Sequence, residues 1–306
     1  MRMLYYPGCA LKEKVTNLNE TTIASANFLG IKLDELPDWT CCSATYPLTT
    51  QKIMNILPQA RTLYKVKQQG KDELTTTCTF CYSTLKRTNK LIRDDKISNK
   101  RINAYLKDDK RIPEYIKGES YEYLGYDGEV KVKHFLEVLK YDIGFENISK
   151  NLKKTLNGLK VAPYYGCQLL RPPKEVDFDD PENPTIMEGF INSLGCEVID
   201  YPYKTECCGS YLSISEPKIA AKASFKVLNS AIRHGADIVI TTCPLCFYNM
   251  DTKQDEIKSD FPEFSNIPVL FFTQLLALGL KIDIDILGLN KHSIDPKPLL
   301  EEKNIV

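Results

Sequence analysis

Ten of the eleven cysteines in this 306-residue chain form two sets that run in the same order along the sequence. Each set is a lone cysteine, then a vicinal pair, then a Cys-x-x-Cys motif. The first set is Cys9, Cys41, Cys42, Cys78 and Cys81, and the second is Cys167, Cys207, Cys208, Cys243 and Cys246. The flanking sequence repeats too, since Thr-Thr precedes both Cys-x-x-Cys motifs and a Leu-Gly step precedes each vicinal pair. The pattern indicates an internal duplication, so the fold must contain two equivalent units.

The segments between the cysteines alternate between strand-like and helix-like patterns. Short apolar runs bounded by Pro or Gly predict strands, and longer runs with apolar residues near helical spacing predict helices. The predicted strands cover 3–6, 32–36, 159–165, 197–201 and 236–240, and the predicted helices cover 22–29, 47–69, 185–194 and 216–234. We also expect a matching helix near the end of each half, at 134–139 and 271–276, and the apolar run 267–280 predicts a buried helix.

This alternation predicts an α/β fold made of two pseudo-symmetric repeats, each a small parallel-sheet, Rossmann-like domain with crossover helices. We place the first domain at 1–150, including a charged helical linker from about 84, and the second at 151–306. Loops that follow parallel strands gather at the carboxyl edge of the sheet, where open α/β folds bind ligands. Each five-cysteine set is therefore expected to converge at one edge, which favours metal ligation or redox chemistry.

The all-thiol composition of the two sets distinguishes between the candidate metal sites. Tetrahedral zinc takes four ligands, so five thiolates leave one over, and none of the three histidines lies inside a cysteine motif. A disulfide relay is disfavoured because the cytosol keeps thiols reduced. Iron–sulfur clusters suit all-thiolate sets, so they are the favoured interpretation, with zinc and a disulfide relay as the alternatives.

The two cysteine sets resemble the tandem CCG (cysteine-rich) domains in the B subunit of heterodisulfide reductase over nearly the whole chain. The first copy departs from the motif after the vicinal pair, because Ser43 stands where the second copy has Gly209. The resemblance implies that each set binds a noncubane 4Fe-4S cluster and that all ten cysteines of the two sets are metal ligands. Cys196 lies outside the repeat, and we expect it to be a buried thiol without a ligand role.

The resemblance also implies a catalytic subunit that reduces the mixed disulfide of coenzymes M and B to two thiols, with one electron from each cluster. Its implied partners are the C subunit of heterodisulfide reductase, which carries cubane clusters, and the flavin-containing A subunit, and a hydrogenase or formate dehydrogenase module is compatible with that complex. Because this substrate is polyanionic, Lys12, Lys14 and Arg171 are the predicted substrate-binding cations. The alternatives are a related CCG-domain subunit of another anaerobic reductase or oxidase, acting on another disulfide, fumarate or a sulfur compound, and a non-catalytic electron relay.

Composition excludes several other classes of protein. Forty basic residues balance forty acidic ones, and acidic residues interrupt the basic stretch 84–130, so the chain lacks the basic excess of nucleic-acid binders. No apolar run reaches the length of a membrane span, and Pro7 and Gly8 precede any signal-peptide core. We therefore expect a cytoplasmic protein with no nucleic-acid partner. His134 and His234 are expected to be structural rather than proton donors.

Overall fold

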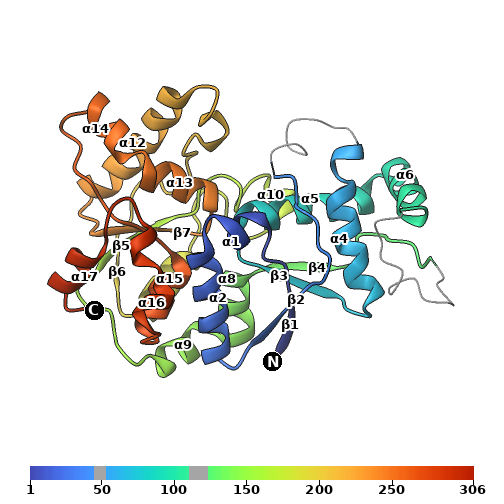
Figure 1. Ribbon diagram of the computed structural model, residues 1–306, viewed down its shortest axis with the longest axis horizontal. Helices are drawn as coiled ribbons and strands as arrows, with labels where there is room; N and C mark the ends of the chain where they lie inside the picture. The colour runs from blue at the N-terminus through green and yellow to red at the C-terminus, as the bar shows by residue number, and fades with distance from the viewer. Residues whose placement is uncertain (45–52, 110–122) are drawn as a thin grey trace.

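Two four-stranded parallel sheets organise the chain, one in each half of the sequence. The computed structural model describes residues 1–44, 53–109 and 123–306, and Figure 1 shows the two sheets in adjacent lobes. The strand order is β2-β1-β3-β4 in the first sheet and β6-β5-β7-β8 in the second. The strands are β1 (Arg2–Tyr5), β2 (Lys32–Glu35), β3 (Glu73–Thr76) and β4 (Lys131–His134), then β5 (Lys160–Tyr164), β6 (Glu197–Val198), β7 (Ile238–Thr241) and β8 (Val269–Phe271). The predicted α/β class with two pseudo-symmetric repeats is confirmed.

The strands of each sheet end at the same level. In the first sheet Tyr5 pairs with both Glu35 and Thr75, and Thr76 pairs with His134. In the second sheet the last residue of β5 pairs with the last residue of β7, which pairs with the last residue of β8. Because all of these strands are parallel, the loops that follow them leave from one edge of each sheet.

The helices of the first half begin where local signals predict. Pro58 lies in the first turn of α4, where its missing N–H is not needed, and Asp95 caps α6 by accepting hydrogen bonds from the backbone N–H groups of Ile97 and Ser98. Part of the helix predicted at 47–69 falls outside the described residues. The helices are α1 (Cys9–Glu13), α2 (Thr16–Phe28), η1 (Ile53–Asn55), α4 (Leu57–Gln68), α5 (Thr79–Asp94), α6 (Lys96–Lys107), α8 (Phe135–Glu137), the π-helix η2 (Val138–Ile143) and α9 (Phe145–Asn151).

The second half repeats this succession and adds short helices at the C-terminal end. No helix in the described ranges has both the length and the apolar character needed to cross a bilayer. The helices are α10 (Pro173–Val176), α11 (Ile186–Ser193), η3 (Ser210–Leu212), α12 (Pro217–Arg233), α13 (Pro244–Thr252), α14 (Gln254–Asp260), α15 (Phe272–Gly279), α16 (Ile284–Leu287), η4 (Leu289–Lys291) and α17 (Lys297–Glu302).

The structure corrects the helix expected over 267–280, because this run is divided between β8 and α15. The side chain of Gln274 accepts a hydrogen bond of 2.8 Å from the backbone N–H of Phe271, and this contact fixes the start of the helix. A buried apolar run suits a strand as well as a helix, so its hydrophobicity could not locate the boundary. The equivalent strand β4 was also missing from the expectation, since four residues with two lysines give no clear strand pattern.

Each half contributes its last helices to the other half. Helix α15 packs against α2, where the hydroxyl groups of Thr21 and Thr273 lie 2.7 Å apart. Helix α9 packs against α11, where the Ser149 hydroxyl donates a 2.7 Å hydrogen bond to the carbonyl oxygen of Ser193. Figure 1 shows α2 beside α15 and α16 in the middle of the molecule. This exchange buries apolar surface between the lobes and fixes how the two sheets sit relative to each other.

Candidate metal centres

Loops at the carboxyl ends of three adjacent strands carry each cysteine set. In the first half, Cys9 begins α1 after β1, the vicinal pair follows β2, and Cys78 directly precedes α5 after β3. In the second half, Cys167 follows β5, the vicinal pair follows β6, and Cys243 directly precedes α13 after β7. The parallel register described above brings each group of loops to one edge of its sheet.

The thiols of the first set approach one another in pairs. The Sγ atoms of Cys9 and Cys41 lie 3.4 Å apart, and those of Cys42 and Cys81 also lie 3.4 Å apart. Gly8, with φ at +75°, lies against this group, because a Cβ atom added there would be 2.7 Å from the Sγ of Cys81. Only glycine combines that backbone conformation with so close an approach to a sulfur atom.

The second set is arranged in the same way. The neighbouring thiol of Cys207 raises the pKa of Cys167, and that of Cys246 lowers the pKa of Cys208. The backbone N–H of Cys246 donates to the Sγ of Cys243 at 3.4 Å, at the first turn of α13. Both Cys-x-x-Cys motifs therefore present their sulfur atoms at the N-terminal end of a helix, which favours negative charge.

The residue after each vicinal pair forms the same turn in both halves. Gly209 has φ at +80° and Ser43 has φ at +55°, so both adopt the left-handed conformation. The backbone N–H of Gly209 donates to the Sγ of Cys207 at 3.3 Å, and that of Ser43 donates to the Sγ of Cys41 at 3.4 Å. The serine in the first copy thus keeps the loop geometry that glycine provides in the second.

Neighbouring thiols stabilise one thiolate in each exposed pair. Hydrogen bonds from Cys42 and then Cys9 lower the pKa of Cys41 to about 2, and the same contact raises the pKa of Cys9. In the second set the hydrogen bond with Cys167 lowers the pKa of Cys207 to about 6. The thiolate is the form of cysteine that binds metals, so Cys41 and Cys207 favour the protonation state that ligation requires.

The donors of both sets suit a group that contains several metal atoms. All of the cysteines are free thiols, and the paired sulfur atoms face one another without a histidine or carboxylate in either set. Within the described residues, no three His, Cys, Asp or Glu side chains surround one point that a single metal ion could fill. All-thiolate donors of this kind are typical of iron–sulfur clusters.

The two sets meet at a seam between the halves, which we define by Thr79, Phe80, Tyr211 and Thr242. The hydroxyl groups of Thr79 and Thr242 lie 2.6 Å apart, and each threonine is adjacent in sequence to the first cysteine of a Cys-x-x-Cys motif. The ring of Phe80, inside the first motif, lies edge-on to the ring of Tyr211 with 5.6 Å between centroids. Tyr211 follows the second vicinal pair, so aromatic side chains connect the two sets.

The cations predicted to bind substrate lie near the cysteine sets but differ in their contacts. Lys12 forms an exposed ion pair with Glu35 at 2.7 Å, and the Lys14 side chain is exposed. Arg171 donates to two backbone carbonyl oxygens at 2.9 and 3.0 Å and to the carboxylate of Glu182 at 3.0 Å. A role in substrate binding stays a prediction for these three residues, and for Arg171 it would require those bonds to be exchanged.

His134 has a structural role, because both of its ring nitrogens bind the backbone. Its Nδ1 accepts from the N–H of Leu136 at 3.2 Å, and its Nε2–H donates to the carbonyl oxygen of Thr77 at 2.9 Å. Burial lowers the pKa of His134 to about 3, so the ring is neutral. This ring therefore holds the residue that precedes Cys78. Cys196 is buried away from both sets, and burial raises its pKa to about 12.

Comparison with known proteins agrees with this arrangement. A family model described as a cysteine-rich (CCG) domain matches residues 3–86 and 161–251. The chain belongs to this family. It is 32% identical over 96% of its length to the 8-methylmenaquinol:fumarate reductase membrane anchor subunit of Wolinella succinogenes, of which it covers 98%.

Other relatives carry the name that the cysteine motifs suggested. The chain is 27% identical over 96% of its length to the B subunit of a ferredoxin/F420H2-dependent CoB-CoM heterodisulfide reductase from Methanosarcina acetivorans, and it covers 94% of that relative. It is 31% identical over 83% of its length to an Archaeoglobus profundus protein described as similar to the B subunit of heterodisulfide reductase, and it covers 82% of that relative. The resemblance to this subunit is thereby confirmed, and the relatives are subunits of reductases.

A solved structure shares the fold. A hypothetical protein from Helicobacter pylori superimposes with a TM-score of 0.72 over 95% of this chain, at 15% sequence identity. The chain spans about half of that protein, 51% of its length. At this identity the likeness concerns the fold alone.

Proposed function

We propose that this chain is the disulfide-reducing subunit of a heterodisulfide reductase complex and that it holds two noncubane 4Fe-4S clusters. The observation that carries the proposal is the pair of equivalent five-thiol sets that meet at one seam. Reduction of a disulfide to two thiols requires two electrons, and an iron–sulfur cluster usually passes one. When bound, the two clusters would supply one electron each to a disulfide such as that of coenzymes M and B.

The chain's own residues perform three tasks in this proposal. The ten cysteines of the two sets hold the clusters, with their thiolates stabilised by neighbouring thiols and backbone N–H groups. The hydrogen bond between Thr79 and Thr242 holds the two Cys-x-x-Cys helices at a fixed separation. Phe80 and Tyr211 cover the seam with apolar rings, which limits the access of water to the reacting sulfur atoms.

Electrons must reach the chain from other subunits. The family of the chain and its relatives support a multisubunit reductase complex, and we propose that the partners are the C subunit of heterodisulfide reductase, with its cubane clusters, and the flavin-containing A subunit. A hydrogenase or formate dehydrogenase module would then feed electrons to the flavin.

A second candidate is an electron-transferring subunit of a quinol:fumarate reductase. The observation that favours it is the 32% identity to the Wolinella succinogenes protein over 96% of the chain. Two assays on the purified native complex separate the candidates. Heterodisulfide reduction with reduced viologen supports the first proposal, and fumarate reduction by a menaquinol without heterodisulfide reduction supports the second.

The cluster assignment is tested by metal analysis of anaerobically purified protein. We expect about eight irons per chain and no stoichiometric zinc, because five thiolates per set exceed the four ligands of tetrahedral zinc. Two zincs per chain with little iron would overturn the assignment.

Two matched variants test whether the clusters act together. Cys42→Ser should remove iron from the first set and Cys208→Ser from the second, since the two thiols lie at the edges of separate sheets. Each substitution alone should nevertheless abolish nearly all heterodisulfide reduction. When groups act as a unit, losing one of them costs about as much activity as losing both. Substantial turnover in a variant that spectroscopy shows to lack one cluster would exclude the paired mechanism.

A further inference from the structure

One face of α5 runs along the seam toward the second half. Phe80, Ser83 and Arg87 recur at the spacing of a helical turn, so their side chains project from the same face. Phe80 contacts the ring of Tyr211, and the Ser83 hydroxyl donates a 3.1 Å hydrogen bond to the side-chain oxygen of Gln168, which is adjacent to Cys167. Arg87 lies one turn further along this face, and its charge interacts with Tyr211 and Glu175 of the second half.

Two polar groups at this end of the seam have unused hydrogen-bonding capacity. The Tyr211 hydroxyl is shielded from solvent and has no hydrogen-bond partner among the described residues. Arg87 is half-buried, and within residues 1–44, 53–109 and 123–306 it forms neither a hydrogen bond nor an ion pair within 4 Å. Its charge acts on Tyr211 and on the carboxylate of Glu175, while burial lowers its pKa. A shielded polar group without a partner is unfavourable, so the Tyr211 hydroxyl, beside a half-buried cation and a proposed reaction centre, points to a ligand.

The neighbouring cations are already engaged. Lys86 donates to the Tyr82 hydroxyl at 3.1 Å and to the carbonyl oxygen of Asp177 at 3.4 Å. Arg171 is held by two carbonyl oxygens and Glu182. Arg87 differs from them because it is half-buried, its charge interacts with Tyr211, and its guanidinium has no hydrogen-bond or ion-pair partner in the described part of the chain.

We propose that Arg87 and Tyr211 form an anion-binding subsite at the seam, which holds a carboxylate, sulfonate or phosphate group of the disulfide substrate. The planar guanidinium donates two parallel hydrogen bonds to such an oxyanion, and the Tyr211 hydroxyl donates a third. This subsite anchors one arm of the disulfide, so that the sulfur–sulfur bond lies between the two cysteine sets. The inference rests on the proposed function and adds the residues that recognise the substrate.

Calorimetry on the anaerobic holoprotein tests the subsite without turnover. The probes are the coenzyme M–coenzyme B disulfide, the neutral bis(2-hydroxyethyl) disulfide and inorganic phosphate. Arg87→Gln should weaken binding of the charged disulfide at least tenfold, about 1.4 kcal/mol, and leave the neutral disulfide unchanged. Arg87→Lys should recover part of the affinity, and Tyr211→Phe should weaken it several-fold. Lys90→Gln is the matched control, since it removes a charge from the same helix at a residue paired with Asp94.

The outcomes separate this inference from the proposed function. Equal affinity of the wild type and Arg87→Gln for the charged disulfide overturns the subsite, as does a wild type that binds neither charged probe. If phosphate binds the wild type as tightly as the disulfide does, and Arg87→Gln loses phosphate binding, the assignment of the subsite to an arm of the substrate is overturned. If the wild type binds the charged disulfide without reducing it, and Arg87→Gln loses that binding, the subsite is supported and the proposed function is refuted. If Arg87→Gln loses iron, Arg87→Lys and Tyr211→Phe decide in its place.

Discussion

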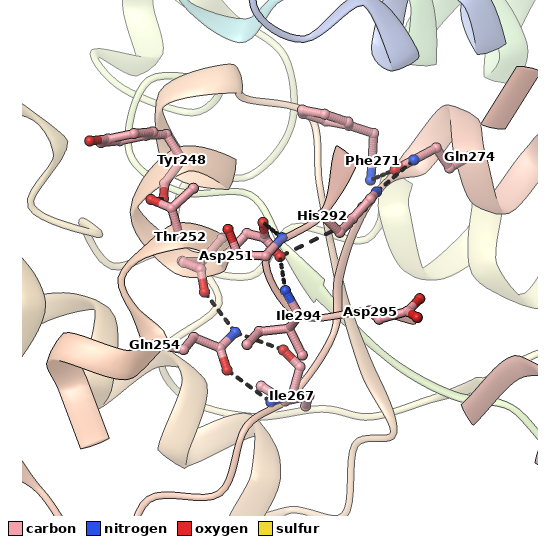
Figure 2. Close-up of polar contacts among 12 residues, drawn as sticks. Tyr248, Asp251, Thr252, Gln254, Ile267, Phe271, Gln274, His292, Ile294 and Asp295 are labelled. Carbon is pink, nitrogen blue, oxygen red and sulfur yellow. Dashed lines mark hydrogen bonds and ion pairs between the residues drawn. The ribbon is translucent and has the colours of Figure 1, made fainter. Parts of the chain in front are cut away.

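Replacing Asp251 by asparagine tests the charge state of a buried pair on the helix that carries the second Cys-x-x-Cys motif. Figure 2 shows the network around it. Gln274 accepts from the backbone N–H of Phe271 through its side-chain oxygen, so its amide nitrogen faces the Nε2 of His292 at 2.8 Å. That nitrogen of the ring must therefore accept, and the proton lies on Nδ1, which faces Asp251 across 3.9 Å.

The distance between Asp251 and His292 lies within the range of an ion pair, but their surroundings favour two neutral groups. Both side chains are 0% exposed. Burial raises the pKa of Asp251 to about 6, although the backbone N–H of Ser293 donates to it at 2.7 Å. Burial also lowers the pKa of His292 to about 4, against smaller opposing effects of a backbone hydrogen bond with Val269 and of the charge of Asp295. With both pKa values displaced toward the neutral forms, the pair carries no net attraction between charges at pH 5.

The sign of the effect on stability follows from proton linkage. A carboxyl with a raised pKa binds its proton more tightly in the folded chain than in the unfolded one, so its contribution to stability grows as pH falls through 6. Relative to Asp251→Asn, the free energy of unfolding of the wild type should rise by about 3 kcal/mol as pH falls from about 6, the pKa in the folded chain, to about 4, the ordinary pKa of Asp. Each pKa unit corresponds to about 1.4 kcal/mol. Between pH 7.5 and pH 5 the expected gain is about 1.4 kcal/mol, and the His292 contribution is common to both proteins.

Anaerobic urea unfolding of holoprotein, followed by circular dichroism at several pH values between 5 and 7.5, measures this difference. Asparagine keeps the oxygen that accepts from Ser293, so the variant changes the titration more than the hydrogen bonding. If Asp251 and His292 form an ion pair instead, the pKa of Asp251 is lowered, and the wild type would lose its advantage over the variant as pH falls. That opposite slope, or a flat difference, would refute the neutral pair.

Two further substitutions test other parts of the structure. Gly8→Ala should lower iron in the first set and destabilise the fold by about 1–3 kcal/mol, because it combines an unfavourable φ with a Cβ 2.7 Å from the Cys81 sulfur. Gly30→Ala is the matched control, since Gly30 has the same φ of +75° and nothing within 4 Å of the added Cβ; iron loss in both variants alike would show that the contact with Cys81 is irrelevant. Cys196→Ala should leave iron content and activity at wild-type levels, because this thiol is buried outside both sets, and loss of a cluster in this variant would refute that placement.

The sequence predicted the repeated α/β architecture because the duplication provides the same pattern twice. The last strand of each half was missed because β8 has three residues and β4 has four, of which only Val132 is apolar. Arg87 falls in the stretch expected to form a charged linker, whereas Leu85 and Ile92 of the same helix are buried. No local pattern distinguishes a solvated arginine from one at an interface, since that difference arises only when α5 packs against the second half.

The duplication does not make the two sides of the seam alike. Aligning the two Cys-x-x-Cys motifs places Phe80 opposite Leu245 and Arg87 opposite Thr252, so neither Phe80 nor Arg87 has a counterpart of the same chemistry at the equivalent position of the second half. Two equivalent cysteine sets suit the delivery of one electron from each side, whereas an asymmetric seam suits a substrate whose two ends differ. A mixed disulfide has this character, because both of its sulfur atoms are reduced in the same way but its two arms must be distinguished. The chain thus combines symmetry in the residues proposed to handle electrons with asymmetry in those proposed to recognise the substrate.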